Sequence, residues 1–388
     1  MCSLVTGWRA ALQKCSTAQV VSPAPVLPSY SGPNLRGIVP ALLAPRGAPR
    51  PTWLPEPARS ATQVVLLVVD GLGWEQLQDH RQIAPTLSAM VGQAITSVAP
   101  TTTATALTSI TTGLTPGEHS IVGYRMELAG DSMNVLRWWT GNGDARRVHE
   151  PKRVQPFAPF MGEDAPIVNR EELERSAFTE SHMRGGRPYS YRTSSGLPVI
   201  VGELLRSGEP FVYAYYDGVD KIAHQRGFGP LYDAELAYVD ALVAQIVAQL
   251  PPGAALLVTA DHGQVHVGSN TRVPHADVQR LTRSASGEGR FRWLHAKPGA
   301  AADLLAAATE HHSDVAWVVS REQAIAQGWF GAVVSPPVAA RYGDVALVPF
   351  APISFDDPVD GTGHPLVCRH GSLTSAEMLV PLLAADGS

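Results

Sequence analysis

Three apolar segments that each end in an aspartate constrain the fold of this chain most strongly. They span residues 64–69, 211–216 and 254–260, and they are followed by Asp70, Asp217 and Asp261. Continuous apolar runs of this length are typical of parallel strands that are buried on both faces. An amphipathic stretch over residues 230–250 lies between the last two runs. The strand–helix–strand order predicts a parallel crossover unit.

Acidic and histidine residues cluster just after the predicted strands. They are Asp70, Asp220, His224, Asp261 and His262. In open α/β sheets, ligands bind outside the carboxyl ends of the strands, so we expect these side chains to converge. Each motif alone also fits a turn, a helix N-cap or a surface histidine. Together they favour a metal site, because Asp and His are the ligands expected for zinc-like cations.

A threonine-rich segment precedes a predicted helix over residues 103–112. Pro100 ends an extended stretch, and Gly113 is a plausible C-cap. A helix N-terminus offers unpaired N–H groups to an anion such as phosphate. A threonine hydroxyl there is a candidate nucleophile if a metal ion activates it. A threonine-capped helix without chemistry is the alternative.

The ordered motifs resemble the alkaline phosphatase superfamily, and most of all its nucleotide pyrophosphatase/phosphodiesterase branch. The matching motifs are Asp70, Pro-Thr-x-Thr at 100–103, Thr-Gly-Leu at 112–114, Pro-x-x-His-x-Ile at 116–121, Asp-x-x-x-His at 220–224, Asp-His-Gly at 261–263 and a late His-Gly at 370–371. They cover residues 64–382. The resemblance implies a three-layer α/β/α fold with a mostly parallel central sheet and an inserted cap.

The resemblance also implies two divalent metal ions, with zinc as the family expectation. One ion would be held by Asp220, His224 and His370, and the other by Asp70, Asp261 and His262, with Thr103 beside them as nucleophile. Counting back from Thr-Gly-Leu selects Thr103 over Thr102. His370 is preferred to His364 because the residues after it resemble the superfamily's C-terminal pattern.

The implied reaction is hydrolysis of a small-molecule phosphoester, which could be a nucleotide, through a phospho-threonine intermediate. A phosphomonoesterase, a phosphonate hydrolase and a catalytically inactive metal- or ligand-binding protein are the alternatives. A sulfatase is disfavoured because Cys-x-Pro-x-Arg is absent. The branch's Pro-Asn-His corresponds here to residues 105–107, Thr-Ala-Leu, so an amide donor is missing. His119 and Lys221 lie near motif residues and are further candidates for substrate contact.

The expected organisation is an N-terminal arm and one catalytic domain. Residues 1–60 are rich in proline, and we expect them to pack on the core without regular helix over residues 40–57. Residues 61–388 form the catalytic domain, in which residues 125–200 are the predicted cap. Further helices are expected near 83–93, 299–310 and 320–327, with a strand near 315–319.

Charge and cysteine content restrict the partners. The net charge is −5 and no long basic run occurs, so binding in a nucleic-acid groove is not expected. Three cysteines without a CxxC motif make a disulfide framework improbable. Residues 1–20 lack an apolar signal region, and no run is long enough for a membrane span. A soluble, cytoplasmic protein is therefore expected, and the oligomeric state stays open.

Overall fold

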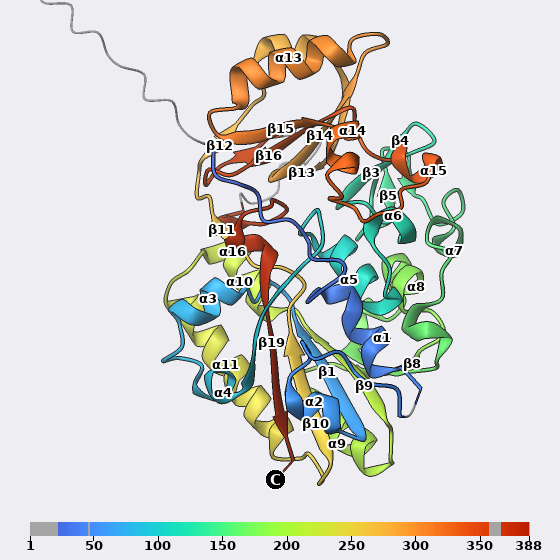
Figure 1. Cartoon of the computed structure of the whole chain (residues 1–388), viewed down its shortest axis with the longest axis vertical. Helices are drawn as coiled ribbons and strands as arrows, with labels where there is room; N and C mark the ends of the chain where they lie inside the picture. The colour runs from blue at the N-terminus through green and yellow to red at the C-terminus, as the bar shows by residue number, and fades with distance from the viewer. Residues whose placement is uncertain (1–21, 46, 357–365, 388) are drawn as a thin grey trace, which may run out of the picture.

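A mostly parallel sheet forms the centre of the molecule (Figure 1). The computed structural model describes residues 22–45, 47–356 and 366–387, and within them the largest sheet has seven strands. In spatial order they are β2 (Val91–Thr96), β19 (Leu379–Asp386), β10 (Ala254–Thr259), β1 (Gln63–Val69), β9 (Phe211–Tyr216), β7 (Pro166–Arg170) and β8 (Arg187–Tyr191).

The three predicted central strands are confirmed. β1 pairs in parallel with both β9 and β10 and therefore lies between them. β9 and β10 are fully buried, which explains their unbroken apolar sequence. Only β19 runs against the other strands of this sheet, since it pairs antiparallel with both β10 and β2. The carboxyl ends of β1, β9 and β10 consequently meet at one edge.

Helices cover both faces of the sheet, which confirms the three-layer α/β/α prediction (Figure 1). α4 (Pro85–Ala89), α9 (Gly196–Arg206) and α11 (Pro230–Val247) pack together as one group. α1 (Ile38–Leu42), α5 (Thr103–Thr112) and α8 (Ala177–Met183) form the other. No helix in the described ranges combines the length and the apolar character that a membrane crossing needs.

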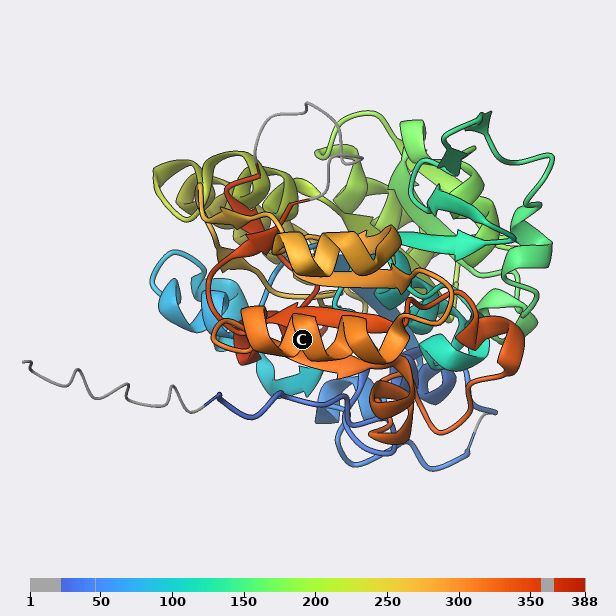
Figure 2. The same ribbon diagram turned by 90° about the horizontal axis from the view of Figure 1, so that it is seen from above.

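A second, antiparallel sheet stands above the carboxyl edge of the first. Its strands are β13 (Thr282–Glu288), β14 (Phe291–Ala296), β16 (Val345–Pro349) and β15 (Ala316–Ser320). α13 (Ala301–His312) lies across it (Figure 2) and α12 (Ala276–Leu281) contacts α13. This layer has its own apolar core, which includes Leu294, Leu304 and Leu347. The expected helices and strand between 299 and 327 are confirmed as α13, β15 and α14 (Arg321–Ala326).

Shorter elements connect these layers. They are η1 (Leu35–Gly37), α3 (Trp74–Asp79), α6 (Pro116–His119), α10 (Gly218–Arg226), α15 (Pro336–Ala339), α16 (Ser375–Met378) and the two-stranded pairs β11 (Val265–His266) with β18 (Cys368–Arg369) and β12 (Thr271–Arg272) with β17 (Ser354–Phe355).

The described part of the proline-rich arm contains two short helices. We expected no regular helix over residues 40–57, and this expectation was wrong at both ends of that range. Pro40 occupies the third position of α1, and Pro57 occupies the second position of α2 (Glu56–Ser60). Proline is tolerated there because the first-turn N–H groups have no partner within the helix. The arm buries Leu35, Ile38 and Val39 against the core.

The helix expected near 83–93 is shorter than predicted. α4 ends at Ala89, and residues 91–96 form β2, which pairs with β19. At Gly92 a Cβ atom would lie 2.0 Å from the carbonyl oxygen of Leu382, so the strands approach too closely there for a side chain. Residues 91–96 therefore form a strand, because their backbone hydrogen bonds to β19 outweigh the local helical pattern.

Residues 125–200, the predicted cap, have two different environments. The first part forms a small sheet of β3 (Arg125–Leu128), β4 (Asp131–Asn134), β5 (Trp139–Thr140) and β6 (Gly143–Asp144), followed by α7 (Pro151–Val154) and η2 (Pro159–Gly162). The second part contains β7, η3 (Glu171–Leu173), α8 and β8. β7 and β8 are the last two strands at one end of the central sheet. Only the other elements of residues 125–200 therefore lie outside that sheet.

Candidate active site

The sequence-predicted metal and nucleophile residues come together at the carboxyl edge of the central sheet. Asp70 follows β1, Asp220 and His224 lie on α10 after β9, Asp261 and His262 follow β10, Thr103 begins α5, and His370 follows β18. His262 Nε2 lies 3.6 Å from Asp70 Oδ1 and 3.4 Å from Asp261 Oδ2. The Thr103 hydroxyl oxygen lies 3.2 Å from the same nitrogen. The ends of β1 and β10 and the start of α5 thus meet at one point.

A second group of ligand-type atoms adjoins the first. Asp220 Oδ1 lies 3.2 Å from His224 Nε2 and 3.9 Å from His370 Nε2. The ligand atoms of Asp220, His224 and His370 all lie within 4.8 Å of one another, and so do those of Asp70, Asp220 and His262. The rings of His262 and His370 stack with their centroids 3.5 Å apart. Asp220 therefore joins two neighbouring clusters.

The three histidines are held in one tautomer. His224 Nδ1 donates to the carbonyl of Cys368 at 2.7 Å, and His370 Nδ1 donates to that of Thr101 at 2.8 Å. His262 Nδ1 faces the carbonyl of Gly263 at 3.1 Å. A carbonyl can only accept, so each Nδ1 carries the proton and each Nε2 presents a lone pair. Metal-binding histidines are commonly oriented in this way.

Two buried carboxylate oxygens at this edge lack a partner. Asp70 Oδ1 and Asp261 Oδ2 make no hydrogen bond within the described residues, although the residues are only 3% and 0% exposed. Burial raises the pKa of both carboxyls, and for Asp70 the neighbouring Asp261 and Asp220 raise it further. A buried carboxylate without a partner is costly. The donor set of carboxylate oxygens and imidazole nitrogens therefore fits divalent cations.

Hydrogen bonds hold the segment of His370 against the loop that precedes α5. Thr101 N donates to the Gly371 carbonyl at 3.1 Å, and Gly371 N donates to Thr101 Oγ1 at 3.0 Å. Thr101 Oγ1 in turn donates to the Ser372 carbonyl at 2.8 Å. These bonds join the C-terminal motif to the residues just before α5.

A buried ion pair that the sequence did not reveal supports the same segment. Arg290 and Glu377 are both fully buried, and two guanidinium nitrogens lie 2.8 Å from the two carboxylate oxygens. Arg290 also donates to the carbonyls of Ala351 and Ile353, and Glu377 accepts from Ser372 N at 3.0 Å. The pair links the second sheet to the loop that carries His370. No local motif signals it, because the partners are 87 residues apart.

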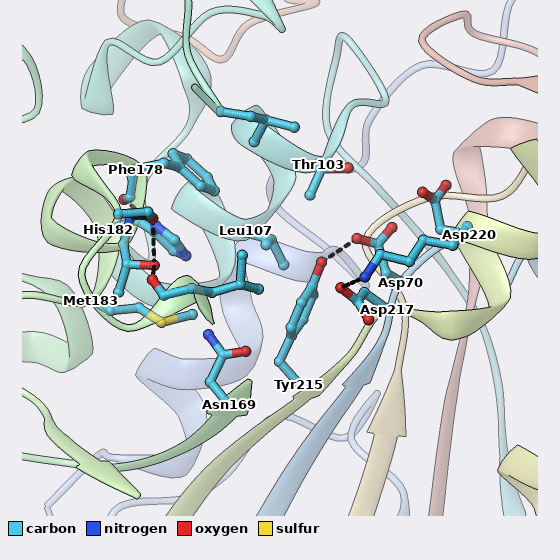
Figure 3. Close-up of a pocket in the computed structure, with 15 residues that line it drawn as sticks. Asp70, Thr103, Leu107, Asn169, Phe178, His182, Met183, Tyr215, Asp217 and Asp220 are labelled. Carbon is cyan, nitrogen blue, oxygen red and sulfur yellow. Dashed lines mark hydrogen bonds and ion pairs between the residues drawn. The ribbon is translucent and has the colours of Figure 1, made fainter. Parts of the chain in front are cut away.

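Two further side chains that the sequence did not predict contact the candidate metal-binding residues directly. The Tyr215 hydroxyl donates to Asp70 (Figure 3). Gln264 Nε2 donates to Asp220 Oδ1 at 2.8 Å. Tyr215 belongs to a strand read only as apolar core, and Gln264 lies just past the Asp-His-Gly motif. A search for polar residues inside and just after the strands would have identified both.

An apolar pocket opens beside the candidate metal centre (Figure 3). Its volume is about 220 Å³, and Thr103, Asp70 and Asp220 reach its wall. The apolar lining is supplied by Leu107, Leu136, Leu173, Phe178 and Met183. Leu107 is one of the three residues that correspond to the branch's Pro-Asn-His, so the pocket has an apolar surface at this position.

The remaining sequence candidates have separate locations. His119 is fully buried; Ile121 N donates to its Nδ1, and its Nε2 donates to Ser109 Oγ at 2.8 Å. Burial lowers the pKa of His119 to about 3. Lys221 lines the pocket and pairs with Asp217 at 2.6 Å. His364 lies outside the described residues.

Comparisons with known proteins identify a family that the sequence matches. The sequence pattern of the type I phosphodiesterase / nucleotide pyrophosphatase family matches residues 64–198 and 202–357. Curated proteins give no significant match to the chain.

Solved structures share the fold at low sequence identity. Murine ectonucleotide pyrophosphatase / phosphodiesterase 5 superposes with a TM-score of 0.62 at 16% identity, covering 84% of this chain and 88% of that one. Phosphonoacetate hydrolase from Sinorhizobium meliloti, in complex with phosphonoacetate, has a TM-score of 0.62 at 16% identity, covering 85% and 91%. The human ectonucleotide pyrophosphatase / phosphodiesterase 5 has the same TM-score at 18% identity, covering 84% and 88%.

Proposed function

Because this chain belongs to the type I phosphodiesterase / nucleotide pyrophosphatase family, we propose that it hydrolyses phosphoric diesters with Thr103 as the nucleophile. The main support is the position of the Thr103 hydroxyl. It lies at the N-terminus of α5 and 3.2 Å from His262 Nε2, beside carboxylate oxygens that have no hydrogen-bond partner among the described residues. A phosphoester placed there meets a nucleophile and a cation-binding cluster together.

The family resemblance assigns one ligand set to each of the two metal ions. Asp220, His224 and His370 would hold one ion, and Asp70, Asp261, His262 and Thr103 would hold the other. Zinc suits these nitrogen and oxygen ligands. When bound, such a pair supplies positive charge that acidifies the threonine hydroxyl and neutralises the phosphoryl oxygens.

The reaction then proceeds in two successive displacements at phosphorus. Thr103 Oγ loses its proton to solvent and forms a bond to phosphorus while the ester bond to the leaving oxygen breaks, and the departing alkoxide takes a proton from solvent. Water subsequently attacks the phospho-threonine and breaks the bond between phosphorus and Thr103; the Thr103 oxygen takes up a proton, and a phosphomonoester is released. The N–H groups in the first turn of α5 face the reacting phosphate and stabilise its negative charge.

The similar structures support this reaction class. An inactive threonine-to-alanine variant of the murine protein is solved in complex with AMP. Phosphonate hydrolysis is the second candidate because a phosphonoacetate hydrolase shares the fold. The carboxylate of such a substrate needs a cation, and Lys221 in the pocket is already paired with Asp217. The apolar lining therefore favours an ester group over a carboxylate.

The test is hydrolysis of bis-p-nitrophenyl phosphate and p-nitrophenyl phosphate by metal-loaded protein. We expect the diester to be preferred, and chelation to abolish its hydrolysis. Thr103→Ala should be inactive, while Thr102→Ala should stay active because the Thr102 side chain makes no capping hydrogen bond. Preference for the monoester would make the protein a phosphomonoesterase. Full activity of Thr103→Ala would overturn the assignment of the nucleophile.

A further inference from the structure

His182 is a buried polar residue in the pocket beside Thr103. It lies on α8, is 2% exposed, and stacks on Phe178 with the ring centroids 4.0 Å apart. Figure 3 shows His182, Phe178 and Met183 on one side of the pocket, and Thr103, Asp70 and Asp220 on the other. A group attached to a phosphorus at Thr103 would therefore extend toward His182.

The hydrogen bonding of His182 fixes which nitrogen faces the pocket as an acceptor. Nδ1 donates to the carbonyl of Phe178 at 2.6 Å, so this nitrogen carries the proton. Nε2 is buried and has no hydrogen-bond partner within the described residues. Burial lowers the pKa of His182 to about 4, which keeps the ring neutral near pH 7. Nε2 is consequently an unused lone pair in a largely apolar wall, which also contains the side chains of Asn169, Ser176 and Thr179.

The rest of the lining excludes a second anionic group. Among the described residues that line the pocket, Lys221 is the only Lys or Arg, and its ammonium group pairs with Asp217. The volume of about 220 Å³ exceeds the roughly 150 Å³ of a cavity known to hold benzene. The pocket therefore has room for a single ring with a small substituent.

We propose that the pocket binds one neutral organic group of the phosphoester, the size of one substituted ring, and that His182 Nε2 accepts a hydrogen bond from a hydroxyl or amino group on it. This inference deepens the proposed function and rests on it, because the group must be carried by a phosphorus at Thr103. A buried acceptor left unpaired is costly, so the site discriminates against groups that lack the donor. His182 is thus a specificity-determining residue.

Binding of arylphosphonates to the metal-loaded protein tests the proposal without turnover. The probes are 2-, 3- and 4-(hydroxymethyl)phenylphosphonate and their methyl ethers, with affinities measured by calorimetry. We expect at least one alcohol to bind about tenfold more tightly than its own ether, as one hydrogen bond of about 1.4 kcal/mol predicts. His182→Phe keeps a ring on Phe178 but lacks the acceptor, so the ratio should fall to about one.

A matched variant and a parallel assay separate the possible failures. Met183→Leu changes an apolar wall residue, so it should alter all affinities together and leave the alcohol-to-ether ratio unchanged. Equal affinities of every alcohol and ether for the wild type, no binding of any probe, or an unchanged ratio in His182→Phe would each overturn the proposal. Hydrolysis of bis-p-nitrophenyl phosphate is measured on the same samples. Selective binding without hydrolysis would refute the proposed function alone.

Discussion

Two buried groups of charges near the same sheet edge are built in opposite ways. In the ion pair of Arg290 and Glu377, both carboxylate oxygens are bonded to the guanidinium and to further donors of the chain. In the candidate metal centre, Asp70 and Asp261 each keep an oxygen without a partner in the described structure. Both groups are desolvated, but only the first is completed by the protein itself.

The difference between these two groups distinguishes a buried charge that stabilises the fold from one that binds a ligand. Burying a carboxylate is tolerated when the fold supplies its partners, as it does for Glu377. An unpartnered buried carboxylate weakens the fold unless a ligand completes it. The same chemical change, from a carboxylate to its amide, should therefore have opposite consequences at the two places.

The largest effect is expected for Asp261→Asn. Asparagine can keep the acceptor for Gly71 N and His262 N, each at 3.0 Å, and places an amide at the unpartnered oxygen. We expect diester hydrolysis to fall by about 10³-fold or more, since one metal site is lost. Without metal, the variant should be at least as stable as the wild type in urea denaturation. A clear loss of stability without metal would break the comparison.

The matched change, Glu377→Gln, should act on stability instead. It leaves the Arg290 guanidinium buried without a counter-charge, at a cost of about 3 kcal/mol in the free energy of unfolding. Urea denaturation with and without metal measures the effect, which should be similar in both. A loss below about 1 kcal/mol would show that the ion pair does not hold this region together.

Tyr215→Phe should have an intermediate effect on metal binding. The substitution removes the donor to Asp70 and keeps the ring in β9. Loss of such a supporting hydrogen bond typically weakens metal affinity by about 10–100-fold. Zinc titration by calorimetry measures this, with Tyr213→Phe as control, because Tyr213 lies on the same strand and its hydroxyl makes no hydrogen bond within the described residues. Equal affinities of the two variants would contradict the role of Tyr215.

The smallest effect is expected for Lys221→Ala. The Lys221 side chain is 47% exposed, and Asp217 keeps Arg170 as a second partner at 3.1 Å. Partly exposed pairs of this kind contribute below about 1 kcal/mol. The variant should retain kcat/KM for bis-p-nitrophenyl phosphate within about fivefold. A loss as large as that of Asp261→Asn would identify Lys221 as a substrate-binding residue.

The sequence predicted the parts of the site whose signal is local. Asp70 and Asp261 stand where continuous apolar runs stop, and Asp220 and His224 share one helical turn, so strand geometry alone predicts their convergence. The position of His370 came from the family resemblance, and the structure places its Nε2 3.9 Å from Asp220.

The features that the sequence did not predict depend on distant pairings. Arg290 meets Glu377 through a β13–β14 hairpin whose strands lack a strong alternating pattern. β2 forms because β19 supplies its hydrogen-bond partners, which overrides the helical pattern after Ala89. To predict that His182 acts as an acceptor, one must know that it is buried and that its Nδ1 contacts the Phe178 carbonyl. Neither fact can be read from the sequence.

The most direct test of the central claim is the number of zinc ions bound per chain, measured by calorimetric titration of chelator-treated protein. We predict two for the wild type, one for Asp261→Asn and two for Glu377→Gln, because Asp261 keeps an oxygen without a partner in the described structure, whereas both oxygens of Glu377 are bonded. Zinc binding that is absent from the wild type, or unchanged by Asp261→Asn, would contradict it.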